Sequence, residues 1–147
     1  MMNRRGITLI ELCLVMAIIA IGAALMAPNM AEWMHHYRLK SATRDIASLM
    51  RAAQMKAVST YCPHRVRFDR GEGTYILERY EGKEWVAEGA SQPFPKGVAI
   101  SHLEPDNFSA KFNPNATSSS GSITLKNAKG FTKRIALTAA TGRIRIE

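Results

Sequence analysis

Residues 4–27 read RRGITLIELCLVMAIIAIGAALMA, and this stretch decides the fold. The run 7–27 is apolar apart from Thr8, Glu11 and Gly22, and a helix that crosses a bilayer takes about 20 apolar residues. A carboxylate inside such a run is energetically costly, which indicates a function. The sequence therefore predicts a long apolar N-terminal helix in which Glu11 has a role of its own.

Two ordinary explanations account for less of this stretch. A secretory signal peptide has an apolar core of roughly 7–15 residues and a small-residue cleavage site, whereas this run is longer, ends without a clean Ala-x-Ala site and contains Glu11. A plain membrane anchor fits the length but has no use for Glu11. Arg4 and Arg5 precede the run, which predicts a cytoplasmic N-terminus and a periplasmic or exterior location for everything after Pro28.

Helical periodicity continues beyond the apolar run. Apolar side chains recur three or four residues apart on one face, namely at Ala42, Ile46, Leu49, Met50, Ala53 and Ala57. Residues 28–61 are therefore expected to continue the helix in amphipathic form, and Pro63 predicts that it ends near Tyr61. Gly22 and Pro28 are the expected points of bending or local melting.

From residue 62 onward the pattern is typical of strands, because apolar residues alternate with polar ones. Strands are predicted around Val66 and Phe68, Tyr75 and Leu77, Trp85 and Val86, Val98 and Ile100, and Phe108 and Phe112, and over Ile123–Lys126, Phe131–Leu137 and Arg143–Ile146. Residues 89–96 and 113–122 are expected loops. The fold class is thus α+β, with a long N-terminal helix packed on antiparallel β-sheet, and 62–147 forms the globular β domain.

Charge is distributed unevenly over the 147 residues. The formal net charge is +8, and the segment 107–146 contains no Asp or Glu. Its basic residues are Lys111, Lys126, Lys129, Lys133, Arg134, Arg143 and Arg145. This asymmetry indicates an anionic partner, or a basic face that meets an acidic one.

The N-terminal stretch resembles the cleavage and assembly signal of type IV prepilins, and the chain as a whole resembles the GspH/FimT family. That family comprises minor pilins of type IV pili and the H-type pseudopilin of type II secretion. The similarity also rests on residues 50–57, MRAAQMKA, and on the closing segment 141–145, TGRIR, which is similar to the family's Gly-Arg-x-Arg. The chain departs from the family at Ile7, where most members have Phe, and at Asn115, where many have Gly.

The resemblance implies a processing and assembly pathway. Prepilin peptidase would remove the leader 1–6 between Gly6 and Ile7, and Ile7 would become the N-methylated first residue. The half-helix 7–27 would hold the protein in the inner membrane and then pack in the core of a pilus or pseudopilus with other subunits. Glu11 would pair there with the N-terminal amine of a neighbouring subunit, because both charges are costly in hydrocarbon and less so when paired.

The C-terminal arginines allow an alternative function. Arg143 and Arg145 lie two apart on a predicted strand, so they point to one face and can bind phosphate oxygens. Lys133 and Arg134 extend this possible DNA-binding set. In some FimT-like minor pilins the tail motif is associated with DNA capture during transformation, whereas in a purely structural subunit such charges protect an edge strand. A membrane-anchored periplasmic adaptor that never polymerises is a further alternative.

The sequence predicts neither an enzyme nor a cofactor or metal site. Cys13 and Cys62 are expected to be unpaired, since one lies in the apolar run and the other in the soluble part. His35 and His36 are adjacent, and neighbours on a helix point about 100° apart, which makes a poor chelate. A surface or filament-interface position is expected for both histidines.

Overall fold

The computed structural model describes residues 8–147, except for the side chains of residues 26–29 and 31. The predicted leader 1–6 and Ile7, including the cleavage site at Gly6, lie outside the described residues. The chain divides into two compact units, of which the first ends at Met34 and the second comprises His35–Glu147.

One helix, α1 (Leu9–Ser59), carries the chain from the first unit into the second. Thr8 caps its start, because the Thr8 hydroxyl oxygen accepts a hydrogen bond of 3.3 Å from the backbone N–H of Glu11. The helix is unbroken through Gly22 and Pro28, so the local melting suggested for those positions is not found. It ends two residues before Tyr61, which adopts a left-handed φ of 54°, a conformation common just past a helix C-terminus.

In the first unit, α1 exposes apolar side chains. The large exposed ones between residues 9 and 25 are Leu9, Ile10, Leu12, Leu14, Val15, Met16, Ile18, Ile19, Ile21 and Leu25. A membrane span was expected over 7–27. Of this range, Ile7 lies outside the described residues, and the side chains of residues 26 and 27 are not described. Within the residues that are described, no helical stretch reaches the length and hydropathy needed to cross a membrane.

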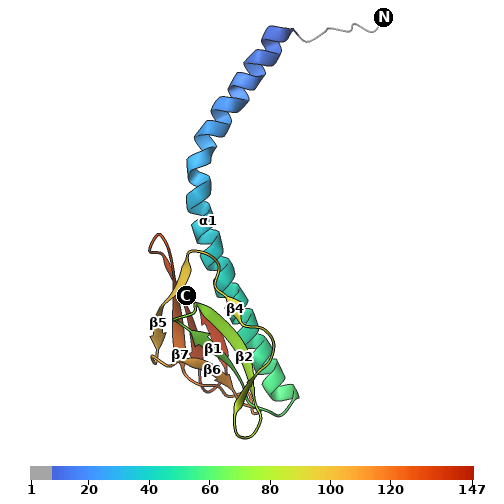
Figure 1. Cartoon of the computed structure of the whole chain (residues 1–147), viewed down its shortest axis with the longest axis vertical. Helices are drawn as coiled ribbons and strands as arrows, with labels where there is room; N and C mark the ends of the chain where they lie inside the picture. The colour runs from blue at the N-terminus through green and yellow to red at the C-terminus, as the bar shows by residue number, and fades with distance from the viewer. Residues whose placement is uncertain (1–7) are drawn as a thin grey trace, which may run out of the picture. The chain divides into compact units, whose positions relative to one another are not determined.

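The second unit contains two antiparallel sheets that lie alongside the later part of α1 (Figure 1). The first sheet has the order β3-β2-β1-β6, and β4 also pairs with β2. Its strands are β1 (His64–Asp69), β2 (Thr74–Tyr80), β3 (Trp85–Ala87), β4 (Gln92–Pro93) and β6 (Ser109–Phe112). The second sheet has the order β5-β7-β8-β9, with β5 (Val98–Glu104), β7 (Gly121–Asn127), β8 (Thr132–Thr138) and β9 (Arg143–Ile146).

The predicted α+β class is confirmed, and most strands lie where the alternation placed them. Strand β9 has the predicted bounds, while β7 begins two residues earlier than expected, at Gly121. The predicted loop 89–96 contains the short strand β4, which pairs through Thr74 with Pro93 and through Tyr75 with Gln92. A two-residue strand that includes a proline has no alternation to reveal it.

The core lies between α1 and the inner faces of both sheets. The helix face predicted from periodicity is confirmed, because all of its members are buried except Leu49, which is half-buried and packs against the core. Thr43 is buried on the same face and donates its hydroxyl hydrogen to the Leu39 carbonyl at 2.7 Å. Ile46 and Met50 are fully buried, and each contributes roughly 1.5–3 kcal/mol to folding. This packing fixes the orientation of the second sheet relative to the helix segment within the unit.

Candidate assembly and binding surfaces

Glu11 lies in the first turn of α1, three residues after the capping residue Thr8. The spacing Thr-x-x-Glu is also that of a capping box, in which the glutamate side chain returns to the cap residue. Of the two capping-box bonds, the described residues show only the one from the Glu11 backbone to Thr8. Glu11 is exposed, and its carboxylate forms no ion pair with any described residue. Thr8 is a residue that the sequence reasoning did not single out, although the Thr-x-x-Glu pattern signals it.

The closing segment 141–145 contains Gly142, a position where the backbone favours glycine. Gly142 is buried, has a φ of 59°, and donates its N–H to the Thr138 carbonyl at 2.9 Å. A Cβ at this position would lie 2.3 Å from Nε2 of Gln54 on α1 and 3.0 Å from the Ala116 carbonyl oxygen. The positive φ therefore disfavours any side chain at this position, and a Cβ would also require the flexible Gln54 side chain to move and the Ala116 carbonyl to shift slightly, so the start of β9 lies close to the helix.

Arg143 and Arg145 share one face of β9, as expected for residues two apart on a strand, and this is the outer face of the second sheet. They pair across the ladder with Thr138 and Ala136, whereas Ile144 and Ile146 pair with Leu137 and Ile135. Both arginines are exposed and form no ion pair within the described part of the chain. Arg134 lies on the same face, and its Nη2 is 3.1 Å from a carboxylate oxygen of Glu104. Glu104 of β5 thus adds an acidic side chain to this face, although the segment 107–146, which supplies the three arginines, contains no Asp or Glu.

Lys133 lies on the other face of the sheet, apart from Arg134, Arg143 and Arg145. It pairs with Leu125, whose side chain is fully buried, and it precedes by two residues the buried Ile135. Since successive side chains of a strand alternate between faces, Lys133 shares the inner, helix-facing side. The four basic residues grouped in the sequence therefore form two separate sets.

Lys133 lines a cavity of about 220 Å³ between α1 and the sheet. The other lining residues are Lys40, Thr43, Arg44 and Ile146. Lys40 and Arg44 are four residues apart and therefore neighbours on the helix surface. Three cationic side chains from two distant segments of the chain thus converge on one small space.

Glu78 is the centre of an ion-pair network on the outer face of the first sheet. Its carboxylate accepts hydrogen bonds from Nε of Arg65 at 2.6 Å and from Nε of Arg67 at 2.8 Å. Burial alone would raise the pKa of Glu78, but the hydrogen bonds and charges of Arg67 and Arg65 hold this pKa below its ordinary value. Arg65 also lies over the ring of Trp85, with its Cζ 4.3 Å from the centroid.

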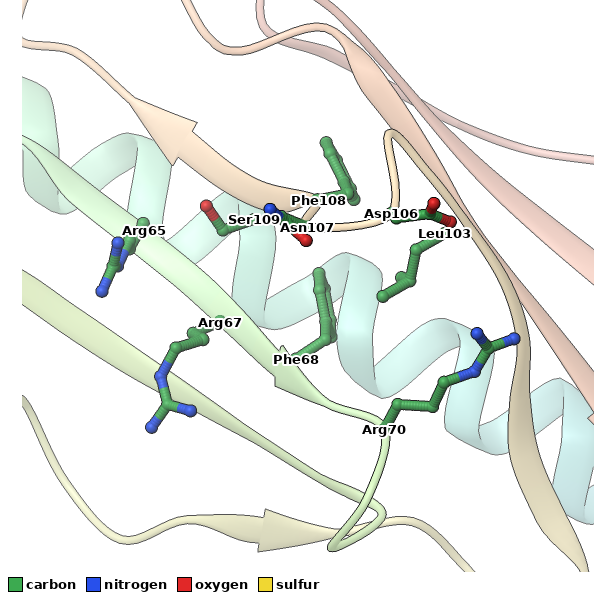
Figure 2. Close-up of a pocket in the computed structure, with 9 residues that line it drawn as sticks. All are labelled: Arg65, Arg67, Phe68, Arg70, Leu103, Asp106, Asn107, Phe108 and Ser109. Carbon is green, nitrogen blue, oxygen red and sulfur yellow. The ribbon is translucent and has the colours of Figure 1, made fainter.

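A pocket of about 310 Å³ lies beside this network, between β1 and the connection from β5 to β6 (Figure 2). Its apolar floor includes Phe68 and Phe108, which stack with their centroids 6.2 Å apart. Arg65 and Arg67 point to one side of Phe68, while Arg70 extends the other way and donates to the Ser101 carbonyl. The three arginines of the pocket are therefore all held by groups of the protein, which indicates a structural role.

A second polar cluster joins the end of α1 to the loop after β3. His64 is fully buried, with Nδ1 2.9 Å from the Cys62 carbonyl oxygen and Nε2 3.1 Å from Glu88. Lys56 Nζ lies 2.5 Å from the other oxygen of Glu88. The hydrogen bond from Lys56 lowers the pKa of Glu88 against the effect of burial, and the charges of Lys56 and His64 add to this. The cluster ties the helix end to the sheet.

The predicted surface position of the histidine pair agrees with the structure. His36 is exposed and packs on Phe131 with ring centroids 4.1 Å apart, while His35 is half-buried. Cys13 and Cys62 are free thiols. Among the described residues, no three His, Cys, Asp or Glu side chains are arranged to hold a metal ion.

Comparison with known proteins identifies the N-terminal region and the fold separately. Residues 1–27 match the family model described as "Prokaryotic N-terminal methylation motif". The curated proteins include no match to the chain.

Three solved structures share the fold. The minor pseudopilin EpsH of the type 2 secretion system of Vibrio cholerae is 10% identical, with a TM-score of 0.64 over 75% of this chain and 96% of that one. E. coli GspH is 12% identical, with a TM-score of 0.62 over 76% and 88%. The type IV minor pilin FimU of Pseudomonas aeruginosa is 14% identical, with a TM-score of 0.63 over 78% and 92%. At these identities the likeness establishes the fold.

Proposed function

We propose that this chain is a minor subunit that assembles into a type IV pilus or a type II secretion pseudopilus after processing by prepilin peptidase. The observation that carries the proposal is the combination, in one chain, of the N-terminal methylation motif with the fold of minor pseudopilins and pilins. Hydrolysis of the bond between Gly6 and Ile7 releases 1–6 and leaves a free amine on Ile7, to which a methyl group is then transferred from a methyl donor. The chain acts as the substrate of an enzyme and has a structural role itself.

The exposed apolar helix supports assembly as the role of the N-terminal segment. Large apolar side chains cover α1 up to Leu25, so the segment requires either lipid or other helices around it. We propose that 7–27 is held in the inner membrane before assembly, with the N-terminus cytoplasmic and the β domain periplasmic. The same surface packs against helices of other subunits in the filament.

Glu11 selects the partner in this assembly. Its carboxylate is exposed one turn into an apolar helix, and it lies four residues from the amine that cleavage would create at Ile7. An unpaired charge in a low-dielectric packing environment is costly, and an opposite charge beside it reduces that cost. We therefore propose that the Glu11 carboxylate pairs with the N-terminal amine of a neighbouring subunit.

Incorporation into sheared filaments tests this function. Glu11→Gln keeps the size of the side chain and the backbone N–H that bonds to Thr8, but removes the charge. The matched control is Thr8→Val, which removes the capping hydroxyl and keeps the carboxylate. We expect Glu11→Gln to reduce incorporation about tenfold, which corresponds to about 1.4 kcal/mol, with membrane levels unchanged. Equal losses in both variants would assign the effect to the helix start instead of the charge.

A second function, DNA binding, is favoured by the exposed and unpaired state of Arg143 and Arg145. If they bind phosphates, each Arg→Ala change reduces the salt slope of DNA affinity by about 1. Lys133→Ala is the internal control, because Lys133 lies on the opposite face and leaves the slope unchanged. Titration of a labelled duplex with the full chain in detergent measures the slopes. A wild-type protein that does not bind the duplex at low salt rules this function out.

A further inference from the structure

The cavity between α1 and the second sheet gathers three like charges. Lys40 and Arg44 reach it from the helix and Lys133 from β8, while Thr43 and Ile146 complete its lining. None of the three cations forms an ion pair or a side-chain hydrogen bond with any residue that the structure describes. Converging cations repel one another, and an anion between them relieves this repulsion.

The nearby carboxylates have other partners or positions. Asp45 follows Arg44 on α1, but its carboxylate accepts a hydrogen bond of 3.3 Å from the Ser41 hydroxyl and it lines a separate cavity with Tyr75. Glu104 pairs with Arg134 on the outer face of the sheet, and Glu147, which follows Ile146, lies opposite Arg134 in the ladder and so belongs to that outer face as well. The negative charge that complements the cavity is therefore expected from another molecule.

The edge of the second sheet at β9 indicates what kind of molecule supplies this negative charge. Strand β9 is the last strand of its sheet, and the backbone groups of Glu147 and Arg134 bond to each other in both directions. In an antiparallel ladder bonded pairs alternate with non-bonded ones, so the N–H and C=O of Ile144 and Ile146 point away from β8. Such an edge accepts a further extended strand, and its hydrogen bonds suit a polypeptide. Ile146 is 41% exposed beside it.

We propose that this edge and the adjoining cavity bind an extended acidic segment of a neighbouring filament subunit, whose carboxylate lies between Lys40, Arg44 and Lys133. The proposal rests on the function proposed above and names the partner surface within it. A nucleic acid fits the site less well, because Arg143 and Arg145 lie on the opposite face and cannot continue its track of cations. A lipid headgroup supplies a negative charge but cannot use the free backbone groups of β9.

Charge reversal in the full-length protein tests the site in cells that make the complete filament machinery. Lys133→Glu and Arg44→Glu each change the charge at the cavity. Lys83→Glu is the matched control, because Lys83 is exposed in the turn between β2 and β3 and the charge change is the same. We expect each cavity variant to be incorporated about tenfold less into sheared filaments than the control. Lys133→Glu also removes a repulsion, so its melting temperature in detergent should equal or exceed that of the wild type.

Site-specific crosslinking identifies the occupant. A photo-crosslinking residue at position 146 should link to an Asp- or Glu-containing segment of another filament subunit, and Lys133→Glu should abolish the link. Changing the linked acid to Lys in the partner should restore it. The proposal is overturned if the cavity variants assemble like Lys83→Glu, or if the link goes to lipid, nucleic acid or a segment without acids. If the wild type itself is missing from filaments, the proposed function fails; if the wild type and the cavity variants assemble equally, only the docking site fails.

Discussion

Gly142→Ala tests how closely the start of β9 approaches α1. An alanine at a φ of 59° adopts left-handed geometry, which costs roughly 1–2 kcal/mol. Its Cβ also meets Nε2 of Gln54 at 2.3 Å and the Ala116 carbonyl oxygen at 3.0 Å, and because the Gln54 side chain can move, the added cost is expected at the lower end of the range for overpacking, about 1 kcal/mol. Gly73→Ala measures the cost of the left-handed backbone alone, because Gly73 has a φ of 63° and an added Cβ would meet nothing within 4 Å.

The two alanine variants should therefore differ in thermal stability. At about 4 °C per kcal/mol for a domain of this size, we expect melting temperatures lowered by about 6 °C for Gly73→Ala and about 10 °C for Gly142→Ala. Near-ultraviolet circular dichroism of the full chain in detergent follows the transition. In a Gln54→Ala background, the cost of Gly142→Ala should fall close to that of Gly73→Ala. Equal costs in the wild-type background, or no relief from Gln54→Ala, would refute the reasoning.

Three further predictions follow from the ion-pair network and the leader. Glu78→Gln should lower the free energy of unfolding at pH 7 by about 1–3 kcal/mol in thermal melts, because Arg65 and Arg67 lose a nearly buried carboxylate. The pKa of Glu78 is lowered in the folded protein, so its contribution is complete above the pKa of the unfolded chain and is lost as the pH falls through the folded value. The wild type should therefore lose more stability than Glu78→Gln as the pH falls below about 5, and parallel curves would contradict this assignment. Gly6→Trp should leave a longer chain by mass spectrometry, still in the membrane fraction, because a bulky residue blocks the peptidase.

Periodicity predicted the elements whose residues make the core, and the physical reason is direct. Positions such as Ile46 and Met50 on the helix, and Val66 in β1, must be apolar because they are buried, so their spacing reveals both the element and its inner face. The helix end was also predictable, since proline restricts the residue before it. Strand β4 was not, because two residues at a sheet edge carry no period.

A candidate site could be predicted when its residues come from one segment of the chain, and was missed when they come from two distant segments. The shared face of Arg143 and Arg145 follows from alternation within β9 alone. The separation of Lys133 from Arg134 also follows from alternation, but the basic run suggested a single patch. The cavity formed by Lys133 with Lys40 depends on which strand packs beside which helical turn, and the sequence contains no local signal for that arrangement.

The most direct test of the account is the mass of the N-terminal peptide from protein recovered in sheared filaments. We expect a peptide that begins at Ile7 and carries one methyl group on its amine, with residues 1–6 removed. A filament fraction that contains the chain with Met1 and the leader intact, or an intact leader on all of the protein in cells with an active prepilin peptidase, would contradict it.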